Sequence, residues 1–351
     1  MSLQDGLAAL NLEMSDRVPR TEYSADKHWE LINAVLGTNV TPNSSPEEQF
    51  KATRAFREAW NYDFVWSVDV GGGDLGDVRT RMGHANFQAG NVDFDDRIGS
   101  YFKSVEEVLA FDPMDKLPAA SHADLVKRFN QAYANKCNIS PNAVNTVGTY
   151  ITAISGFIDL FGWDYFLEAL GEDDERLGKV MERYSQWMQR FYNAMADSDA
   201  PFILIHDDIV WTSGPFMSPE WYRKYVFPCY KKYVSPLKEA GKKILYCSDG
   251  DYSMFIDDIA PHVDGFIMEP MTDMKYIAEK YGKTHSFIGN ADTRILLTGT
   301  KEDIKNEVKR CMDIGKKCPG FIMAVGNHIP ANTPVENALW YNECYEKMSK
   351  R

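Results

Sequence analysis

Reactive side chains stand directly after two neighbouring apolar runs in the second half of the chain. Residues 244–246 are apolar and lead into Cys247 and Asp249, and residues 265–268 lead into Glu269. Ligands bind at the carboxyl ends of parallel strands in β/α proteins, because the loops that follow the strands meet at one face. The sequence therefore predicts that a thiol and two carboxylates lie on a common active-site rim.

Other apolar runs in this half of the chain end on polar residues in the same way. These residues are His206, Asp207, Asp208, Asn290, Asp292, Asn327 and His328. If the strands close into a barrel, their loops converge on one mouth, and residues distant in sequence meet there. We therefore treat them as parts of one candidate site.

Cys247, Glu269 and His328 together offer a sulfur, an oxygen and a nitrogen ligand. This mixed set is typical of a catalytic zinc that keeps one open coordination position and acts as a Lewis acid on a heteroatom. The alternative is an inert thiol at Cys247 and a hydrogen-bonded loop residue at His328. Both interpretations stay open, because the chain has no closely spaced ligand motif.

Asp207 and Asp208 are adjacent, so in an extended chain their side chains face opposite ways and only one can point inward. The inward one is predicted to be a general acid or a substrate anchor. The alternative is a cap on the turn at residues 213–214. His206 is interpreted as a buried partner of a carboxylate, and Asp292 as a cap residue before the next helix.

Positioning these side chains requires a regular alternation of strands and helices. Strands are predicted at residues 62–68, 145–155, 202–206, 243–247, 264–268, 286–288 and 320–325. Thr300 and Asp303 predict a capping box at the start of one of the helices between them. Seven or eight such strands favour a closed (β/α)8 TIM barrel over an open sheet. We predict one domain over residues 1–351, with residues 1–60 as an N-terminal helical segment and residues 80–99 as a hairpin or long loop.

Composition narrows the classes of partner. The chain has a formal net charge of -13 and a pI near 5.1, whereas nucleic acids and anionic membranes attract basic surfaces. No apolar run approaches the roughly 18 residues of a membrane span, and the N-terminus lacks the layout of a signal peptide. The six cysteines are scattered, as is usual for reduced thiols. These features predict a cytoplasmic protein that binds neither nucleic acid nor membrane.

Several motifs of the chain match one family in order and spacing. They are Asp207-Asp208-Ile209, Ser218-Pro219-Glu220-Trp221-Tyr222, Pro228, Cys247-Ser248-Asp249-Gly250, Gly289-Asn290-Ala291-Asp292, Gly299-Thr300-Lys301-Glu302, Gly326-Asn327-His328-Ile329-Pro330 and Thr333-Pro334-Val335-Glu336-Asn337. The chain thereby resembles the uroporphyrinogen decarboxylase superfamily, and residues 16–19 resemble its N-terminal segment. The true decarboxylases carry an arginine-rich, RQAGRY-like signature that binds tetrapyrrole carboxylates. Residues 17–23 supply no such cluster, so the chain is more similar to the corrinoid-dependent methyltransferase branch.

That resemblance implies transfer of a methyl group from a small O-methyl or N-methyl compound to cob(I)alamin. A separate corrinoid protein would carry the cobalamin, because the chain shows no cobalamin-binding module. Methyltransferases of this branch hold zinc through a His-x-Cys motif and a later Cys, and Cys247, Asp249 and Asn327 stand at those positions. The loss of two thiolates favours a harder set in which Glu269 and His328 or Asp249 join the remaining thiol, suited to an oxygen or nitrogen methyl donor.

Roles for the remaining residues follow from this expectation. Asp207, Asp208 and Asp249 are the catalytic candidates, and Asp208 or Asp249 would protonate the departing heteroatom. Two alternatives stay open. One is a decarboxylase of a non-tetrapyrrole acid, in which Asp207 or Asp208 stabilises developing positive charge without a metal. The other is a non-catalytic barrel used for binding.

Substrate contacts are predicted from polar and aromatic residues near the strand ends. The substrate-binding candidates are Asn290, Trp211 and Asn327. The aromatic residues Trp66, Phe87, Trp211 and Phe216 indicate an aromatic or otherwise apolar substrate.

Overall fold

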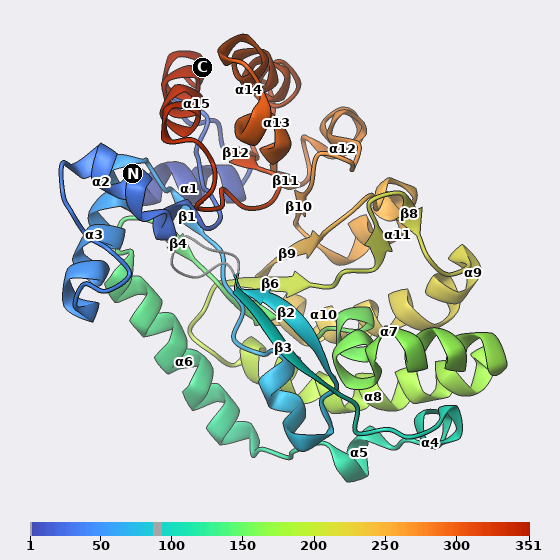
Figure 1. Ribbon diagram of the computed structural model, residues 1–351. Helices are drawn as coiled ribbons and strands as arrows, with labels where there is room; N and C mark the ends of the chain where they lie inside the picture. The colour runs from blue at the N-terminus through green and yellow to red at the C-terminus, as the bar shows by residue number, and fades with distance from the viewer. Residues whose placement is uncertain (1, 87–92) are drawn as a thin grey trace.

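Parallel strands form the centre of the molecule (Figure 1). A computed structural model describes residues 2–86 and 93–351. The main sheet has six strands in the order β12-β11-β10-β9-β6-β5, and all neighbouring pairs are parallel. A further parallel pair, β1 with β4, continues it, since a single residue separates β4 from β5. The bounds are β1 (Phe64–Val65), β4 (Val144–Asn145), β5 (Val147–Thr149), β6 (Phe202–His206), β9 (Lys243–Ser248), β10 (Gly265–Met268), β11 (Ser286–Ala291) and β12 (Phe321–Val325).

Extended residues near the N-terminus close this sheet into a barrel. Arg20 forms parallel bridges both to Tyr62, just before β1, and to Met323 in β12. The two open edges are thereby joined, and the result is the predicted (β/α)8 TIM barrel. Residues 1–60 thus supply a strand position of the barrel in addition to the predicted helices. The assignment of one domain to residues 1–351 stays a prediction.

Helices surround the barrel (Figure 1). They are α1 (Leu3–Leu10), α2 (Trp29–Leu36), α3 (Pro46–Ala59), α4 (Val105–Leu109), α5 (Pro113–Lys116), α6 (His122–Ile139), α7 (Ile154–Glu172), α8 (Asp174–Ala196), α9 (Pro219–Trp221), α10 (Phe227–Glu239), α11 (Ile256–Ile259), α12 (Met274–Tyr281), α13 (Thr293–Thr298), α14 (Lys301–Gly315) and α15 (Val335–Met348). The capping box of Thr300 and Asp303 starts α14 as predicted. Asp292 caps α13, which confirms its structural interpretation. Among the described helices, none is both long and apolar enough to cross a membrane.

Several predicted elements differ in extent from the observed ones. The strand predicted over residues 62–68 is reduced to β1 (Phe64–Val65). The strand predicted over residues 145–155 ends at Thr149, because the Asp207 carboxylate accepts hydrogen bonds from the N–H groups of Ala153 and Ser155 where α7 begins. The hairpin predicted over residues 80–99 is present as the antiparallel pair β2 (Arg81–Asn86) and β3 (Asp93–Gly99). Phe87 lies outside the described residues.

Alternation along the central strands separates the inside of the barrel from its helical shell. Leu204, Leu245 and Ile267 belong to the small apolar cluster inside the barrel, whereas Ile203 and Ile205 belong to the large cluster under the helices. Because successive strand residues face opposite sides, residues 206, 208, 247, 249 and 269 continue the inner face, and residue 207 continues the outer face. The strand period therefore decides which polar residues reach the barrel mouth.

A buried charged network holds the closing N-terminal segment in place. Arg20 and Glu22 are both fully buried at the side chain, with Nε of Arg20 2.9 Å from Oε1 of Glu22. Glu22 also accepts hydrogen bonds from the Val325 N–H at 2.9 Å and from the Tyr341 hydroxyl at 2.8 Å. The Arg20 guanidinium stacks over the rings of Trp60, Tyr341 and Tyr345. Closure of the barrel thus depends on a paired charge that has no access to water.

Candidate active site

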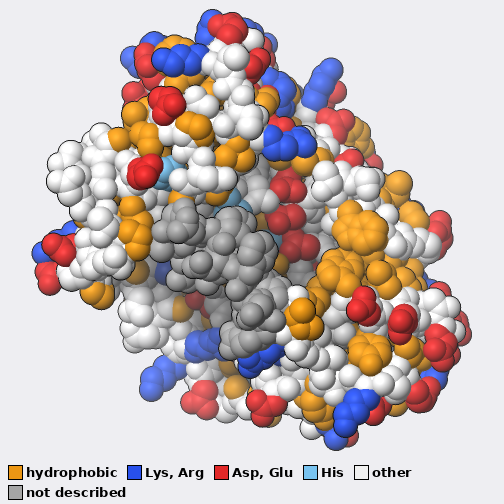
Figure 2. Space-filling model, viewed as in Figure 1, with side chains coloured by type: hydrophobic (Ala, Val, Ile, Leu, Met, Phe, Trp, Pro, Cys, Tyr) orange, Lys and Arg blue, Asp and Glu red, His pale blue; other side chains and the backbone are white. Residues whose placement is uncertain are grey.

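A cavity of about 230 Å³ lies at the carboxyl ends of the central strands. Leu204 and Ile267 form its apolar floor. Polar and aromatic side chains form its walls: Tyr23, Trp66, Tyr150, His206, Cys247, Asp249, Asn327 and His328. Figure 2 shows acidic side chains gathered in a hollow near the centre of this face. The predicted convergence of distant strand ends is therefore present in the fold.

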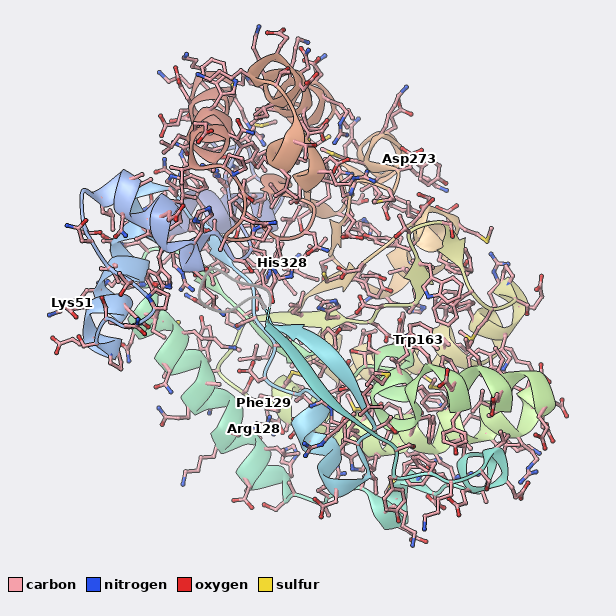
Figure 3. The ribbon with its side chains drawn as sticks, viewed as in Figure 1. Lys51, Arg128, Phe129, Trp163, Asp273 and His328 are labelled. Atoms are coloured by element: carbon pink, nitrogen blue, oxygen red, sulfur yellow. The ribbon has the colours of Figure 1, made fainter. Side chains whose placement is uncertain are left out.

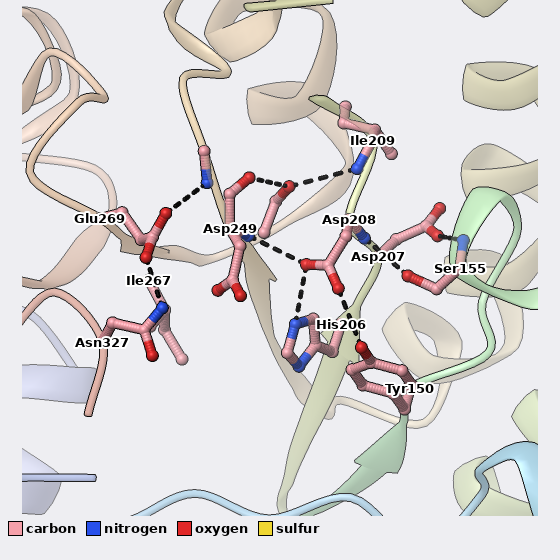
Figure 4. Close-up of polar contacts among 12 residues, drawn as sticks. Tyr150, Ser155, His206, Asp207, Asp208, Ile209, Asp249, Ile267, Glu269 and Asn327 are labelled. Atoms are coloured by element: carbon pink, nitrogen blue, oxygen red, sulfur yellow. Dashed lines mark hydrogen bonds and ion pairs between the residues drawn. The ribbon is translucent and has the colours of Figure 1, made fainter. Parts of the chain in front are cut away.

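Asp208 is the centre of a hydrogen-bond network on one wall of the cavity (Figure 4). Its Oδ1 lies 3.0 Å from His206 Nε2 and accepts the Asp249 N–H at 2.9 Å. Its Oδ2 accepts the Tyr150 hydroxyl at 3.1 Å. The backbone N–H of Asp208 donates to Ser155 Oγ at 2.7 Å. Asp208 thus holds the strand ends of β6 and β9 together, and the interpretation of His206 as a carboxylate partner is confirmed.

Asp249 presents a carboxylate to the cavity. Its backbone N–H donates to Asp208 and its backbone carbonyl accepts from the Ser248 hydroxyl, whereas its carboxylate accepts no hydrogen bond from the described part of the chain. The next residue, Gly250, has φ of +81° and donates its N–H to Glu269 Oε2 at 2.6 Å. A Cβ at Gly250 would lie 2.6 Å from the Trp211 carbonyl oxygen, so glycine is required for this turn. The turn thus fixes the main chain next to Asp249, which lines the cavity.

The charges of this wall shift one another's proton affinities. Burial opposes the charged forms of both Asp208 and His206, but their mutual attraction holds the pKa of Asp208 below its usual range and raises the pKa of His206. Asp249 is exposed at the cavity wall, yet desolvation by that wall and repulsion from Asp208 and Glu269 raise its pKa to about 7. The site therefore combines an ion pair with a carboxyl group that is partly protonated near neutral pH.

Asp207 faces away from the cavity, as the strand period requires. It is fully buried, and its carboxylate accepts the N–H groups of Ala153 at 3.2 Å and Ser155 at 2.8 Å and the Tyr230 hydroxyl at 2.6 Å. These contacts join β6 to α7 and α10. The cap on the turn at residues 213–214 is the alternative predicted for the inward carboxylate, which is Asp208; its observed contacts are instead with Tyr150, His206 and the Asp249 N–H. The Asp207 carboxylate has structural partners, so we retain the catalytic prediction for Asp208 and Asp249.

Because Asp207 is buried, we expect it to make the stability of the fold depend on pH. Burial raises its pKa to about 6, so the folded state binds the proton more tightly than the unfolded chain does. The contribution of Asp207 to the free energy of unfolding is therefore fully present below about pH 4 and is lost as the pH rises through about 6. Because the pKa is raised by about two units, this contribution amounts to about 3 kcal/mol. In Asp207→Asn we expect the change in the free energy of unfolding between pH 4 and 7 to be smaller by a comparable amount. Urea denaturation of both proteins between pH 4 and 7 measures it, and identical pH dependence of the two would contradict the assignment.

The predicted metal ligands lie at the cavity but do not form a ligand set. Cys247 and His328 line the cavity, whereas the Glu269 carboxylate is occupied by the Gly250 N–H and by Asn327 Nδ2. Burial and the neighbouring carboxylates raise the pKa of the Cys247 thiol well above its usual value. His328 lies near the centre of the view in Figure 3. Burial, and to a smaller extent the positive charge of Lys27, lower the pKa of His328 to about 4.

A different trio comes closest to a metal site. Among the described residues, His206, Asp208 and Asp249 form the one group in which three ligand atoms all lie within 4.8 Å of one another. Two of these atoms are already bonded to each other, since His206 Nε2 is the partner of Asp208 Oδ1. A metal ion would have to replace that hydrogen bond, so the donors as arranged fit an ion pair better than a tetrahedral zinc.

The three predicted substrate-binding residues have different positions. Asn327 lines the cavity, and its Nδ2 donates to Glu269. Asn290 is fully buried, with its amide bonded to the carbonyl oxygens of Glu269 and Thr272 and to Arg310, so the structure gives it a packing role. Trp211 is exposed and lies outside the cavity lining, in contact with other aromatic rings.

Sequence reasoning missed two residues of the cavity wall, Tyr23 and Tyr150. Tyr150 directly follows β5, so its place after a strand was an available signal. Tyr23 gives no local signal. It reaches the cavity because the N-terminal segment pairs with the strand ends, through a parallel bridge to His328, whose ring centroid lies 4.4 Å from that of Tyr23.

Comparisons of the sequence show similarity to one family. The model of the family "Uroporphyrinogen decarboxylase (URO-D)" matches residues 93–348. A uroporphyrinogen decarboxylase from Geobacter sulfurreducens is 24% identical over 231 residues, which cover 60% of this chain and 66% of that protein. One from Carboxydothermus hydrogenoformans is 30% identical over 175 residues, covering 50% and 47%. The matches thus span less than two thirds of the length of either relative.

Comparison with solved structures shows the same architecture. A methyltransferase from Methanosarcina mazei superposes with a TM-score of 0.66 at 20% sequence identity, covering 99% of both chains. At this identity the likeness shows the shared barrel fold.

Proposed function

Because the chain belongs to the uroporphyrinogen decarboxylase family, we propose that it uses the family's barrel for methyl transfer. It would move a methyl group from a small O-methyl or N-methyl compound to cob(I)alamin on a separate corrinoid protein. The observation that supports this best is the acidic cavity, in which the unoccupied Asp249 carboxyl group stands beside the Asp208–His206 pair. The barrel shared with a Methanosarcina mazei methyltransferase is consistent with the proposal.

The chemistry requires help for the atom that loses its methyl group. The corrinoid supplies the electron pair that attacks the methyl carbon, and the bond between that carbon and the heteroatom breaks. The departing heteroatom keeps the bonding pair and must gain a proton or leave as a neutral amine. Asp249, partly protonated near pH 7, is placed to donate that proton, and Asp208 holds the Asp249 main chain in position.

Decarboxylation of a non-tetrapyrrole acid is the second candidate, favoured by the names of the curated relatives. The cavity argues against an acidic substrate. Among its described lining residues there is no Lys or Arg, while Asp249 lines it and Asp208 and Glu269 lie close enough to raise the pKa of Asp249. A carboxylate substrate would meet like charge there, with a repulsion that low-dielectric walls strengthen.

Anaerobic incubation with free cob(I)alamin and a panel of methyl donors tests the proposal. We expect the absorbance spectrum to change to that of methylcobalamin, with stoichiometric loss of methyl from one donor class. Asp273→Asn is a matched control, because Asp273 caps α12 far from the cavity and asparagine also caps helices (Figure 3). Release of CO₂ from carboxylic acids without any methylation of cobalamin would favour the second candidate instead.

Zinc, which the family resemblance implies, supplies Lewis-acid activation of a heteroatom where it is bound. Here His206 and Asp208 are bonded to each other, and the Glu269 carboxylate is bonded to Gly250 and Asn327, so the donors as arranged do not fit a zinc ion. We expect active purified protein to contain clearly less than one zinc per chain and Cys247→Ala to keep its activity, measured by elemental analysis beside the methyl-transfer assay. One zinc per chain that is lost in Cys247→Ala together with activity would restore the predicted zinc site.

A further inference from the structure

The cavity has an acidic wall whose charge is only partly balanced within the protein. His206 balances Asp208, at 3.0 Å. Asp249 on the same wall and Glu269 beside it have no Lys or Arg partner among the described ion pairs. Within the described residues, the Glu269 carboxylate accepts hydrogen bonds from two neutral donors, the Gly250 N–H and Asn327 Nδ2. Negative charge therefore remains in a partly desolvated cavity, which favours a cation from solution.

Two Lys or Arg side chains influence groups of this region without lining the cavity. Arg294, close enough to Glu269 to interact with it, forms an ion pair with Asp292 at 2.7 Å. Lys27 is close enough to His328 for its charge to help lower the pKa of that imidazole. Neither residue lines the cavity. The balancing charge is therefore expected from the ligand.

An aromatic wall completes the same cavity. The rings of Tyr23, Trp66 and Tyr150 line it. The ring centroids of Tyr23 and Trp66 lie 5.7 Å apart, and Phe64 packs edge-on against the Trp66 ring at 6.2 Å. Tyr150 packs edge-on against His206, with 4.6 Å between centroids. Aromatic faces attract cations with a diffuse charge, and a cage of such rings next to carboxylates is the arrangement that recognises methylated ammonium groups.

We propose, on the basis of the proposed methyl transfer, that the methyl donor is a small methylated ammonium cation bound between these rings and the carboxylates. A quaternary nitrogen carries charge but no hydrogen, so it needs no directed acceptor and binds against rings. A small divalent ion needs ligand atoms that point at it. His206 and Asp208 do not offer theirs, because they are bonded to each other. A neutral methyl ether would leave the charge of the wall unbalanced.

The bond changes balance with such a donor. The carbon–nitrogen bond breaks, its electron pair stays on nitrogen, and the methyl carbon bonds to the electron pair of the corrinoid. The nitrogen leaves as a neutral amine. It then takes a proton from water, so that the amine no longer has the lone pair with which it could take the methyl group back.

Calorimetric titration of the protein with choline, without any corrinoid, tests the proposal. The matched neutral probe is 3,3-dimethylbutan-1-ol, which has the same shape without the charge. We expect choline to bind at least tenfold more tightly than the alcohol, and Trp66→Leu to weaken choline by about fivefold to thirtyfold. Asp249→Asn is expected to weaken choline but not the alcohol. High salt is expected to weaken choline as well.

Two controls keep loss of binding separate from loss of fold. Trp66→Phe retains a ring and is expected to keep most of the affinity. Trp340→Leu changes a tryptophan on α15 whose indole N–H bonds to the Lys301 carbonyl, and is expected to leave choline binding unchanged. Thermal melting of each variant checks folding. Equal affinity for choline and the alcohol would overturn the proposal, and so would stoichiometric Zn²⁺ binding that displaces choline.

The outcome also separates this inference from the proposed function. Selective choline binding without any methylation of cobalamin would leave the cation site standing and remove the methyl transfer. Methylation by neutral ethers, with no selective choline binding, would keep the methyl transfer and remove the cationic donor.

Discussion

With an O-methyl donor, whose oxygen must gain a proton as it departs, Asp249→Asn is expected to lower kcat/KM for methyl transfer by about a hundredfold or more. General acid catalysis by a positioned side chain typically contributes between 10² and 10⁴ in rate, and asparagine cannot donate that proton. The variant also removes a carboxylate from the wall beside Asp208 and Glu269. Its backbone N–H can still donate to Asp208, so the network and the fold are expected to persist.

The direction in which the rate changes with pH follows from the pKa of Asp249. Burial and the neighbouring carboxylates raise the pKa of Asp249 to about 7, so the proton-bearing form prevails below neutrality. With an O-methyl donor, we expect kcat of the wild-type protein to fall by up to tenfold per pH unit above about 7. The same limb should be missing in Asp249→Asn. Both profiles are obtained from steady-state rates measured from about pH 5.5 to about pH 9. This range extends roughly one and a half to two pH units on either side of the pKa of Asp249.

Asp207→Asn is the informative comparison for this site. Asp207 is adjacent to Asp208 but faces the helical shell, where it accepts hydrogen bonds from α7 and from Tyr230. Its variant is expected to change stability and to leave the alkaline limb of the rate profile in place. Wild-type activity of Asp249→Asn at every pH would show that Asp249 is not the proton donor.

Arg20→Ala is expected to destabilise the protein by about 3–5 kcal/mol, the range found when one partner of a buried ion pair is removed. The variant leaves Glu22 charged and unpaired in a fully buried site, and it removes the guanidinium from between three aromatic rings. Because Arg20 bridges Tyr62 and Met323, closure of the barrel is weakened as well. The free energy of unfolding from urea denaturation measures the change.

Two further variants define the origin of this loss. Arg20→Met with Glu22→Gln removes both charges and is expected to be more stable than Arg20→Met alone. Lys51→Ala breaks the exposed pair with Glu47 and is expected to cost less than about 1 kcal/mol. Figure 3 shows Lys51 at the periphery of the molecule. A cost for Arg20→Ala as small as that for Lys51→Ala would refute the assigned role of the buried pair.

The barrel and most of its strand ends could be predicted because strands carry a period of two and end on polar residues. The apolar runs before His206, Cys247 and Glu269 are strands of the central sheet. The opposite directions of Asp207 and Asp208 also followed from that period. Cap signals at Thr300 and Asp292 were local in sequence and are present in the structure.

Which polar groups meet one another was not a property of any single strand. Glu269 and Asn290 both follow the predicted pattern, yet the Gly250 turn engages the Glu269 carboxylate and the packing of α14 engages the Asn290 amide through Arg310. Partner choice depends on the loop of a neighbouring strand and on a helix docked later in the chain. Pattern reasoning therefore placed these residues near the mouth without assigning their contacts.

By itself the sequence determined the alternation of strands and helices, the face on which each strand residue lies and the acidic character of the mouth. Only the tertiary structure decided that the segment around Arg20 closes the barrel, that it brings Tyr23 to His328, and that Asp208 pairs with His206. The physical reason is that periodicity is a local property of the chain. Closure and pairing join residues far apart along it, and their energies come from burial and charge in the assembled cavity.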